Sequence, residues 1–103
     1  MILVRLVFQA KFGKGGELAA MFKEFGKVAM GSGMARPRSV RILTDLSGPF
    51  DTVVEELEFD SFAAWEENQQ AMWANPAVRP VMERTGELIA GGHKEFYTVE
   101  QEF

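Results

Sequence analysis

The chain has 103 residues, of which 47% are hydrophobic and 25% are charged, and its formal net charge is −4. This length and composition are typical of a folded protein, and we predict one domain over residues 1–103. Nucleic-acid binding requires clustered Lys and Arg, and the densest basic stretch, Arg36-Pro37-Arg38, is short. We therefore expect no nucleic-acid partner.

The absence of cysteine excludes disulfides, thiolate nucleophiles and Cys-ligated zinc. The apolar stretch at the start of the chain is too short for a signal peptide. No apolar run approaches the roughly 20 residues that a bilayer-spanning helix needs. These features predict a cytoplasmic protein with no membrane partner.

Residues 2–9 predict a strand, because they are rich in aliphatic and β-branched side chains. Its alternate residues form an apolar face and a mixed face that contains Arg5. Residues 17–30 predict an amphipathic helix that ends at Gly31-Ser32-Gly33. The glycines at residues 13–16 lack the Gly-Lys-Ser/Thr ending of a phosphate-binding loop, so we interpret them as a loop into the helix. The apolar stripe of the helix consists of Leu18, Met21, Phe22, Phe25 and Ala29.

Residues 38–46 and 50–59 predict two strands joined by a tight hairpin with Ser47-Gly48 at its tip. In that register Ile42 lies opposite Val53 and Arg41 lies opposite Val54. One face of the hairpin is apolar and the other is mixed. Glu55 is the exception on the apolar face, and we expect it near a sheet edge or a helix end.

Asp60 or Ser61 is expected to cap a helix that Asn75-Pro76 interrupts. A second helical segment follows, and Gly91-Gly92 is expected to end it. Residues 93–99 predict the last strand. The inner face of the first of these two segments carries Phe62, Trp65, Gln69, Met72 and Trp73.

The order strand-helix-strand-strand-helix-strand predicts a ferredoxin-like α+β fold. We expect a four-stranded antiparallel sheet of strand order 4-1-3-2 with the helices on one face. The other face is half apolar, and an uncovered face of this kind is typical of an association surface. We therefore predict a homodimer in which two sheets pack face to face.

Four stretches resemble small proteins of the dimeric α+β barrel superfamily, and among these the NIPSNAP-like proteins. They are Thr44–Val54, Ser61–Trp65, Asn75-Pro76 and Glu95–Glu100. The resemblance implies a dimeric α+β barrel. The functions that it implies range over cofactor-free monooxygenases of antibiotic biosynthesis, haem-degrading enzymes, muconolactone isomerase-like proteins and members with no known activity.

Two groups of residues are candidates for binding. Charged side chains on the mixed face of the sheet either bind an anionic or hydroxylated substrate or form an ion-pair network inside the dimer. A pocket between helices and sheet would take a small apolar or aromatic ligand. The charged group consists of Arg5, Arg41, Glu56 and Glu95, and the pocket group of Phe22, Phe25, Trp65, Asn68 and Trp73.

His93 and Tyr97 are the candidate catalytic residues, since His93 is the only histidine and suits general-base chemistry. A metal site is not expected, because one histidine with Glu95 makes a poor ligand set. Haem is not expected either, because the haem-using relatives present a histidine from a helix. We therefore predict a small-molecule-binding protein without a cofactor. The alternatives are a cofactor-independent monooxygenase or isomerase acting on an aromatic or polyketide-like compound, and a structural or regulatory dimer module.

Overall fold

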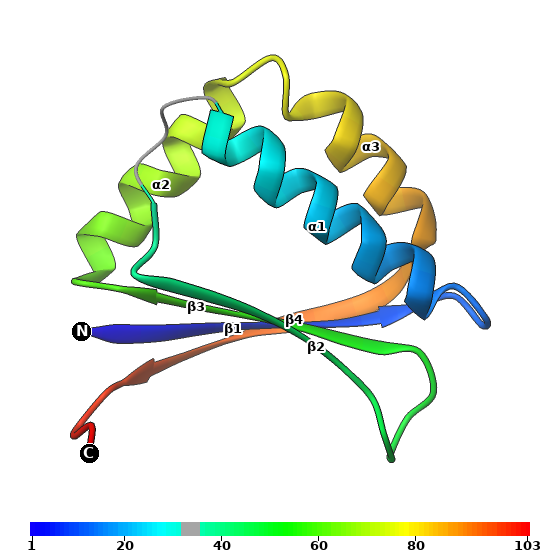
Figure 1. The fold of residues 1–103 in the computed structure, drawn as a ribbon, viewed down its shortest axis with the longest axis horizontal. Coiled ribbons are helices and arrows are strands. Elements are labelled where there is room, and N and C mark those ends of the chain that lie inside the picture. Colours follow the sequence, from blue (N-terminus) through cyan, green and yellow to red (C-terminus); the bar gives the residue numbers. More distant parts are fainter. Residues whose placement is uncertain (32–35) are drawn as a thin grey trace.

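A computed structural model describes residues 1–31 and 36–103 of the chain. In this part, four antiparallel strands form one sheet of order β2-β3-β1-β4, and the helices lie on one face of it (Figure 1). This is the predicted ferredoxin-like fold, because the strand order is 4-1-3-2 read from the other edge. The strands are β1 (Ile2–Ala10), β2 (Ser39–Thr44), β3 (Thr52–Phe59) and β4 (Ile89–Thr98), and the helices are α1 (Gly15–Gly31), α2 (Phe62–Ala74) and α3 (Arg79–Leu88).

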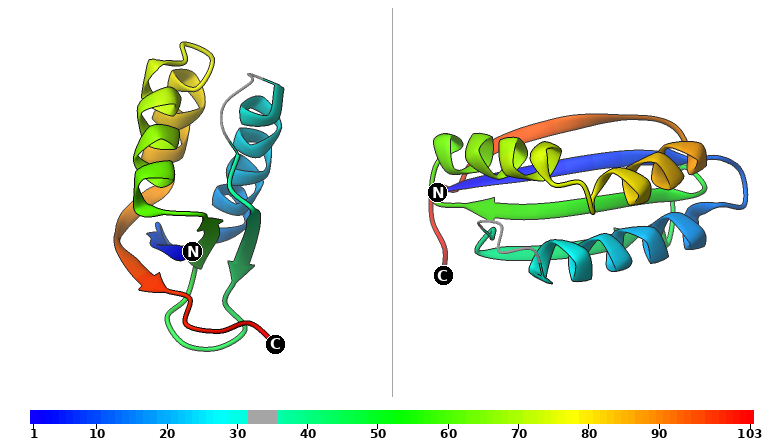
Figure 2. Two further views of the ribbon diagram at one scale, coloured as in Figure 1. Left: turned by 90° about the vertical axis from the view of Figure 1, so that its left-hand side faces the viewer. Right: turned by 90° about the horizontal axis from the view of Figure 1, so that it is seen from above.

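The core lies between the sheet and the helix layer, which Figure 2 shows edge-on and from above. Val4 and Val53 on the sheet are fully buried, as is Leu18 on α1. The rings of Phe8 and Phe22 pack with their centroids 5.0 Å apart. The opposite face of the sheet has no helix over it in the described part of the chain (Figure 1). None of the described helices is long and apolar enough to cross a membrane.

The β2–β3 hairpin has a register two residues away from the predicted one. Ile42 lies opposite Glu55 and Arg41 lies opposite Glu56. The connection is longer than a two-residue turn, because the Asp45 N–H donates to the Thr52 carbonyl and the Thr52 N–H donates to Asp45 Oδ1. A shift of two residues leaves every side chain on its predicted face, since side chains alternate along a strand.

Asp51 at the end of this connection holds the start of α1. Its carboxylate accepts hydrogen bonds from the Gly13 and Gly15 N–H groups, with lengths of 2.8 and 3.1 Å. A carboxylate at a helix N-terminus satisfies free N–H groups and complements the helix dipole. The glycine loop therefore receives an anionic side chain of the chain itself. Ser32 and Gly33, which belong to the predicted helix end, lie outside the described residues.

The second half of the chain confirms the predicted cap and corrects the last strand. Ser61 caps α2 by accepting from the Ala64 N–H at 3.1 Å. The expected helix end at Gly91-Gly92 is wrong, because β4 begins at Ile89 and includes both glycines. A Cβ on Gly92 would lie 2.5 Å from the Val7 carbonyl oxygen, so the close approach of β1 requires glycine there.

Candidate functional site

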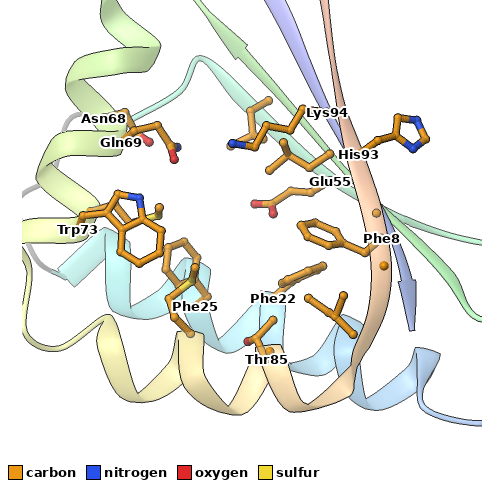
Figure 3. A pocket seen from close by; sticks show the side chains of 18 residues that line it. Phe8, Phe22, Phe25, Glu55, Asn68, Gln69, Trp73, Thr85, His93 and Lys94 are labelled. Atoms are coloured by element: carbon orange, nitrogen blue, oxygen red, sulfur yellow. The ribbon is translucent and has the colours of Figure 1, made fainter. Parts of the chain in front are cut away.

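A cavity of about 510 Å³ lies between the sheet and the helices. Its walls are largely aromatic and aliphatic, with Phe8 from β1, Phe22 and Phe25 from α1, Trp73 from α2 and Met82 from α3 (Figure 3). Residues of all three helices and of the strands line it, and the space between them is left unfilled. A cavity of this size and lining is typical of sites for small, mainly apolar ligands.

Most of the predicted pocket residues line this cavity. Phe22, Phe25, Asn68 and Trp73 do so, and Asn68 is buried although it is polar. Trp65 differs, because it is not among the lining residues. It lies about one helical turn before Asn68, in an aromatic cluster with Phe62 and Phe96 at centroid distances of 5.2 and 4.9 Å.

Glu55 is the cavity residue that the sequence interpretation misplaced. It lies in the middle of β3, an inner strand, and not near a sheet edge or a helix end. Its carboxyl group points into the cavity (Figure 3). The signal was present in the sequence, since a charged residue stood at an apolar position of a strand that the predicted order places inside the sheet.

Glu55 is half-buried, and its carboxyl group has no hydrogen-bond or ion-pair partner among the described residues. Burial raises its pKa from 4.5 to about 7, because an apolar environment disfavours the charged form. A carboxyl group of this kind exchanges a proton near neutral pH. It is the cavity group best suited to recognise the polar part of a ligand.

Most of the polar side chains of the cavity lie toward one end, while Thr85 lies at the other, where its hydroxyl donates to the Val81 carbonyl at 2.8 Å. Figure 3 shows Asn68, Gln69 and Lys94 at the first of these ends, Phe22 and Phe25 at the other, and Glu55 between them. Lys94 is exposed, and its Nζ lies 5.8 Å from the centroid of the Trp65 ring. The cavity is therefore amphipathic, with a cationic group at its polar end.

The four charged residues predicted for the mixed face form one chain of ion pairs across the sheet. Arg41 on β2 bonds to Glu56 on β3, and Arg5 on β1 bonds to Glu56 at 3.3 Å and to Glu95 on β4 at 3.1 Å. The strand register brings these residues together, because Arg5 lies directly opposite both Glu56 and Glu95. The network lies on the face without helices, away from the cavity.

His93 and Tyr97 join the same network. His93 Nε2 lies 2.7 Å from Glu95 Oε2, and the Tyr97 hydroxyl donates to Glu95 Oε1 at 2.9 Å. The hydrogen bonds from His93, Tyr97 and Arg5 lower the pKa of Glu95 to about 2. The bond to Glu95 also raises the pKa of Tyr97. His93 borders the cavity through its backbone, while its ring points away from it (Figure 3).

Among the described residues, no group of three or more His, Cys, Asp or Glu side chains could hold a metal ion. His93 and Tyr97, the two candidate catalytic residues, both bond to the Glu95 carboxylate on the open face of the sheet. The titratable side chains that reach into the cavity from the described lining are Glu55 and Lys94.

Comparison with solved structures identifies the fold. An uncharacterised NIPSNAP domain protein from Burkholderia xenovorans superposes with a TM-score of 0.80 at 18% sequence identity, over 95% of this chain and 93% of that chain. The chain has the fold of the NIPSNAP proteins. A NIPSNAP family protein from Agrobacterium tumefaciens superposes with a TM-score of 0.78 at 16% identity, over 94% of this chain and 90% of that chain.

A solved structure whose description names an activity also has this fold. A candidate antibiotic biosynthesis monooxygenase from Chloroflexus aurantiacus superposes with a TM-score of 0.73 at 17% identity, over 100% of this chain and 97% of that chain. No protein-family model and no curated protein matches the sequence. The resemblance to NIPSNAP-like and monooxygenase-like proteins is thus confirmed at the level of the fold, which hosts more than one function.

Proposed function

We propose that the protein binds a small, largely apolar molecule in the cavity between the sheet and the helices. One observation carries the proposal: the cavity of about 510 Å³ has aromatic walls and contains a carboxyl group, Glu55, without a partner among the described residues. A purely structural module is expected to fill its interior at close-packed density. A ligand would supply the missing apolar contacts and a partner for the carboxyl group.

An oxygenase or isomerase is the alternative, and the monooxygenase-like neighbour of the same fold is consistent with it. In this alternative His93 and Tyr97 are the candidate reactive groups. Their side chains bond to Glu95 on the face away from the cavity. A molecule in the cavity would not touch them, and this favours binding over a reaction at these two residues.

We also propose that a second copy of the chain covers the open face of the sheet. This face combines the ion-pair chain with apolar side chains, and Leu43 and Tyr97 on it are 37% and 51% exposed. Face-to-face packing of two sheets would remove these side chains from water and surround the paired charges. The homodimer does not involve the cavity, so the two proposals are tested separately.

Binding is tested by isothermal titration with 4-phenylbutan-1-ol, a neutral probe with an aromatic body. We expect saturable binding that is lost when Gly86 is replaced by leucine. Gly86 lines the cavity, and a Cβ there meets no atom within 4 Å, so the new side chain has room to enter the cavity.

Gly26→Leu is the matched control, because Gly26 is also a helical glycine with open space at its Cβ and does not line the cavity. It should bind the probe like the unmodified protein. Equal loss of binding in both variants, or absence of saturable binding of both this alcohol and the carboxylate with the same aromatic body, would contradict the proposed function.

A further inference from the structure

The two titratable side chains of the cavity, Glu55 and Lys94, lie at different positions in the sheet. Glu55 lies at the centre of the sheet with apolar neighbours such as Leu6 and Leu57, whereas Lys94 lies on the edge strand β4. The two belong to one row of residues across the sheet, since Leu6 of β1 lies directly opposite each of them. With one strand between them, their Cα atoms are roughly 10 Å apart, about two strand spacings.

A ligand that fills the cavity removes water from Glu55. Burying an ionised carboxylate without a partner in apolar surroundings costs much more free energy than burying the neutral carboxylic acid. The neutral form can also both donate and accept a hydrogen bond. The helices add no titratable side chain to the described lining, and the His93 ring points to the other face. An occupied cavity therefore favours the neutral form of Glu55, unless the ligand itself brings a cation.

A cationic ligand is disfavoured by Lys94. Its ammonium group shares the cavity with the Asn68 and Gln69 amides at the polar end (Figure 3). An anionic head at this end would meet the Lys94 ammonium group and the Gln69 amide, with the neutral Glu55 as a further donor. Charge-assisted hydrogen bonds of this kind are stronger than neutral ones.

We propose that the cavity selects an amphipathic monocarboxylate, whose apolar body lies among Phe22, Phe25 and Trp73 and whose anionic head lies beside Lys94, with Glu55 protonated. This inference rests on the proposed binding function and adds the chemical class of the ligand. Because Glu55 must hold a proton, binding takes up a proton and weakens as the pH rises.

The test compares three probes that share one aromatic body and differ in the head group. These are 4-phenylbutanoate, 4-phenylbutan-1-ol and 4-phenylbutan-1-amine, titrated calorimetrically at pH 6 and pH 8 into the full chain. We expect the carboxylate to bind most tightly at pH 6. Its affinity should fall about tenfold at pH 8, as Glu55 with a pKa of about 7 loses its proton.

Two variants assign the effect to the named side chains. Glu55→Gln should remove the pH dependence of carboxylate binding and the proton uptake, which titrations in buffers of different ionisation enthalpy measure. Lys94→Met keeps an unbranched side chain that is one atom shorter and removes the charge. This variant should bind 4-phenylbutanoate about tenfold more weakly, and its affinity for 4-phenylbutan-1-ol should change by less than about twofold.

The outcomes separate this inference from the proposed function. If the alcohol binds and the carboxylate binds no better, or if the amine binds best, the cavity binds ligands but does not select an anion, and this inference is overturned. Persistence of the pH dependence in Glu55→Gln would overturn it as well. If none of the three probes binds, both the proposed function and this inference fail.

Discussion

At the scale of single residues, Glu55 shows how one side chain sets the character of an otherwise apolar cavity. The carboxyl group lies on an inner strand and faces the helices, where an aliphatic side chain would pack without cost. Its raised pKa means that the folded state holds the proton more tightly than the unfolded chain does. The position therefore lowers the stability of the fold at neutral and alkaline pH, as functional groups in apolar sites commonly do.

The sign of this effect gives a prediction for Glu55→Gln. Between the unfolded pKa of 4.5 and the folded pKa of about 7 the folded state binds more protons, so the free energy of unfolding falls as the pH rises through this range. Glutamine does not titrate. From pH 5 to pH 8, the free energy of unfolding of the variant should therefore rise by about 2 to 3 kcal/mol relative to that of the unmodified protein. Urea denaturation at both pH values measures this difference.

Glu67→Gln is the control for this measurement, since Glu67 is exposed on α2, away from the open face of the sheet, and does not line the cavity. It should leave the difference in unfolding free energy between pH 5 and pH 8 within about 0.5 kcal/mol of that of the unmodified protein. A Glu55→Gln variant with the same pH dependence as the control would show that the Glu55 carboxyl is not desolvated.

At the scale of elements, β4 is decided by its contact with β1. The glycines at 91 and 92 are typical of a helix end, yet both lie within a strand that pairs with β1 from Ile2 to Ala10. The sheet supplies backbone hydrogen bonds to a segment whose own sequence has weak strand propensity. Tertiary pairing here outweighs local preference, as is common for strands.

The two glycines of β4 give a matched pair of substitutions. Gly92→Ala should destabilise the fold by about 2 kcal/mol or more, because the new Cβ would lie 2.5 Å from the Val7 carbonyl oxygen and force β1 and β4 apart. Gly91→Ala meets no atom within 4 Å and should change the unfolding free energy by less than about 0.5 kcal/mol. Urea denaturation of both variants measures the difference, and equal effects would refute the close approach.

At the scale of the whole molecule, the two faces of the sheet have separate tasks. The face toward the helices builds the core and the cavity, and the open face holds the ion-pair chain from Arg41 to Glu95. Arg41 has a side chain that is 69% exposed in the single chain. An exposed ion pair contributes little to stability, whereas one that is buried by a partner is costly to break.

The homodimer predicts how Arg41→Ala behaves. If a second copy covers the open face, the variant removes one of the two arginines that pair with Glu56 in the interface and should destabilise the protein by several kcal/mol, on the order of 3. Arg84→Ala is the control, because Arg84 pairs with Glu24 at 2.8 Å between two helices, with both side chains about half exposed. Its cost should stay below about 1 kcal/mol.

Sedimentation velocity measures the assembly directly. We expect a dimer at micromolar concentration. A monomer together with an Arg41→Ala cost that matches the control would contradict the dimer and leave the open face in solvent.

The sequence by itself determined the element order, the two faces of the sheet and most of the cavity residues. Hydrophobic alternation and helical periodicity are local signals, and they placed Phe22, Phe25 and Trp73 on the helix side without knowledge of the fold. Asn68 was a candidate only through the family resemblance. The local signals also placed Arg5 and Glu56 on the same face, and strand pairing then brought the two side chains together. The predicted hairpin register was wrong by two residues, but each side chain remained on its predicted face, because side chains alternate along a strand with a period of two.

The tertiary structure alone decided the hairpin register, the start of β4 and the chemistry of Glu55. The register depends on a loop closed by Asp45 and Thr52, and β4 begins where β1 offers a partner. The start of β4 and the surroundings of Glu55 follow from contacts between residues far apart in the chain, and local sequence patterns do not encode the distances that set such contacts.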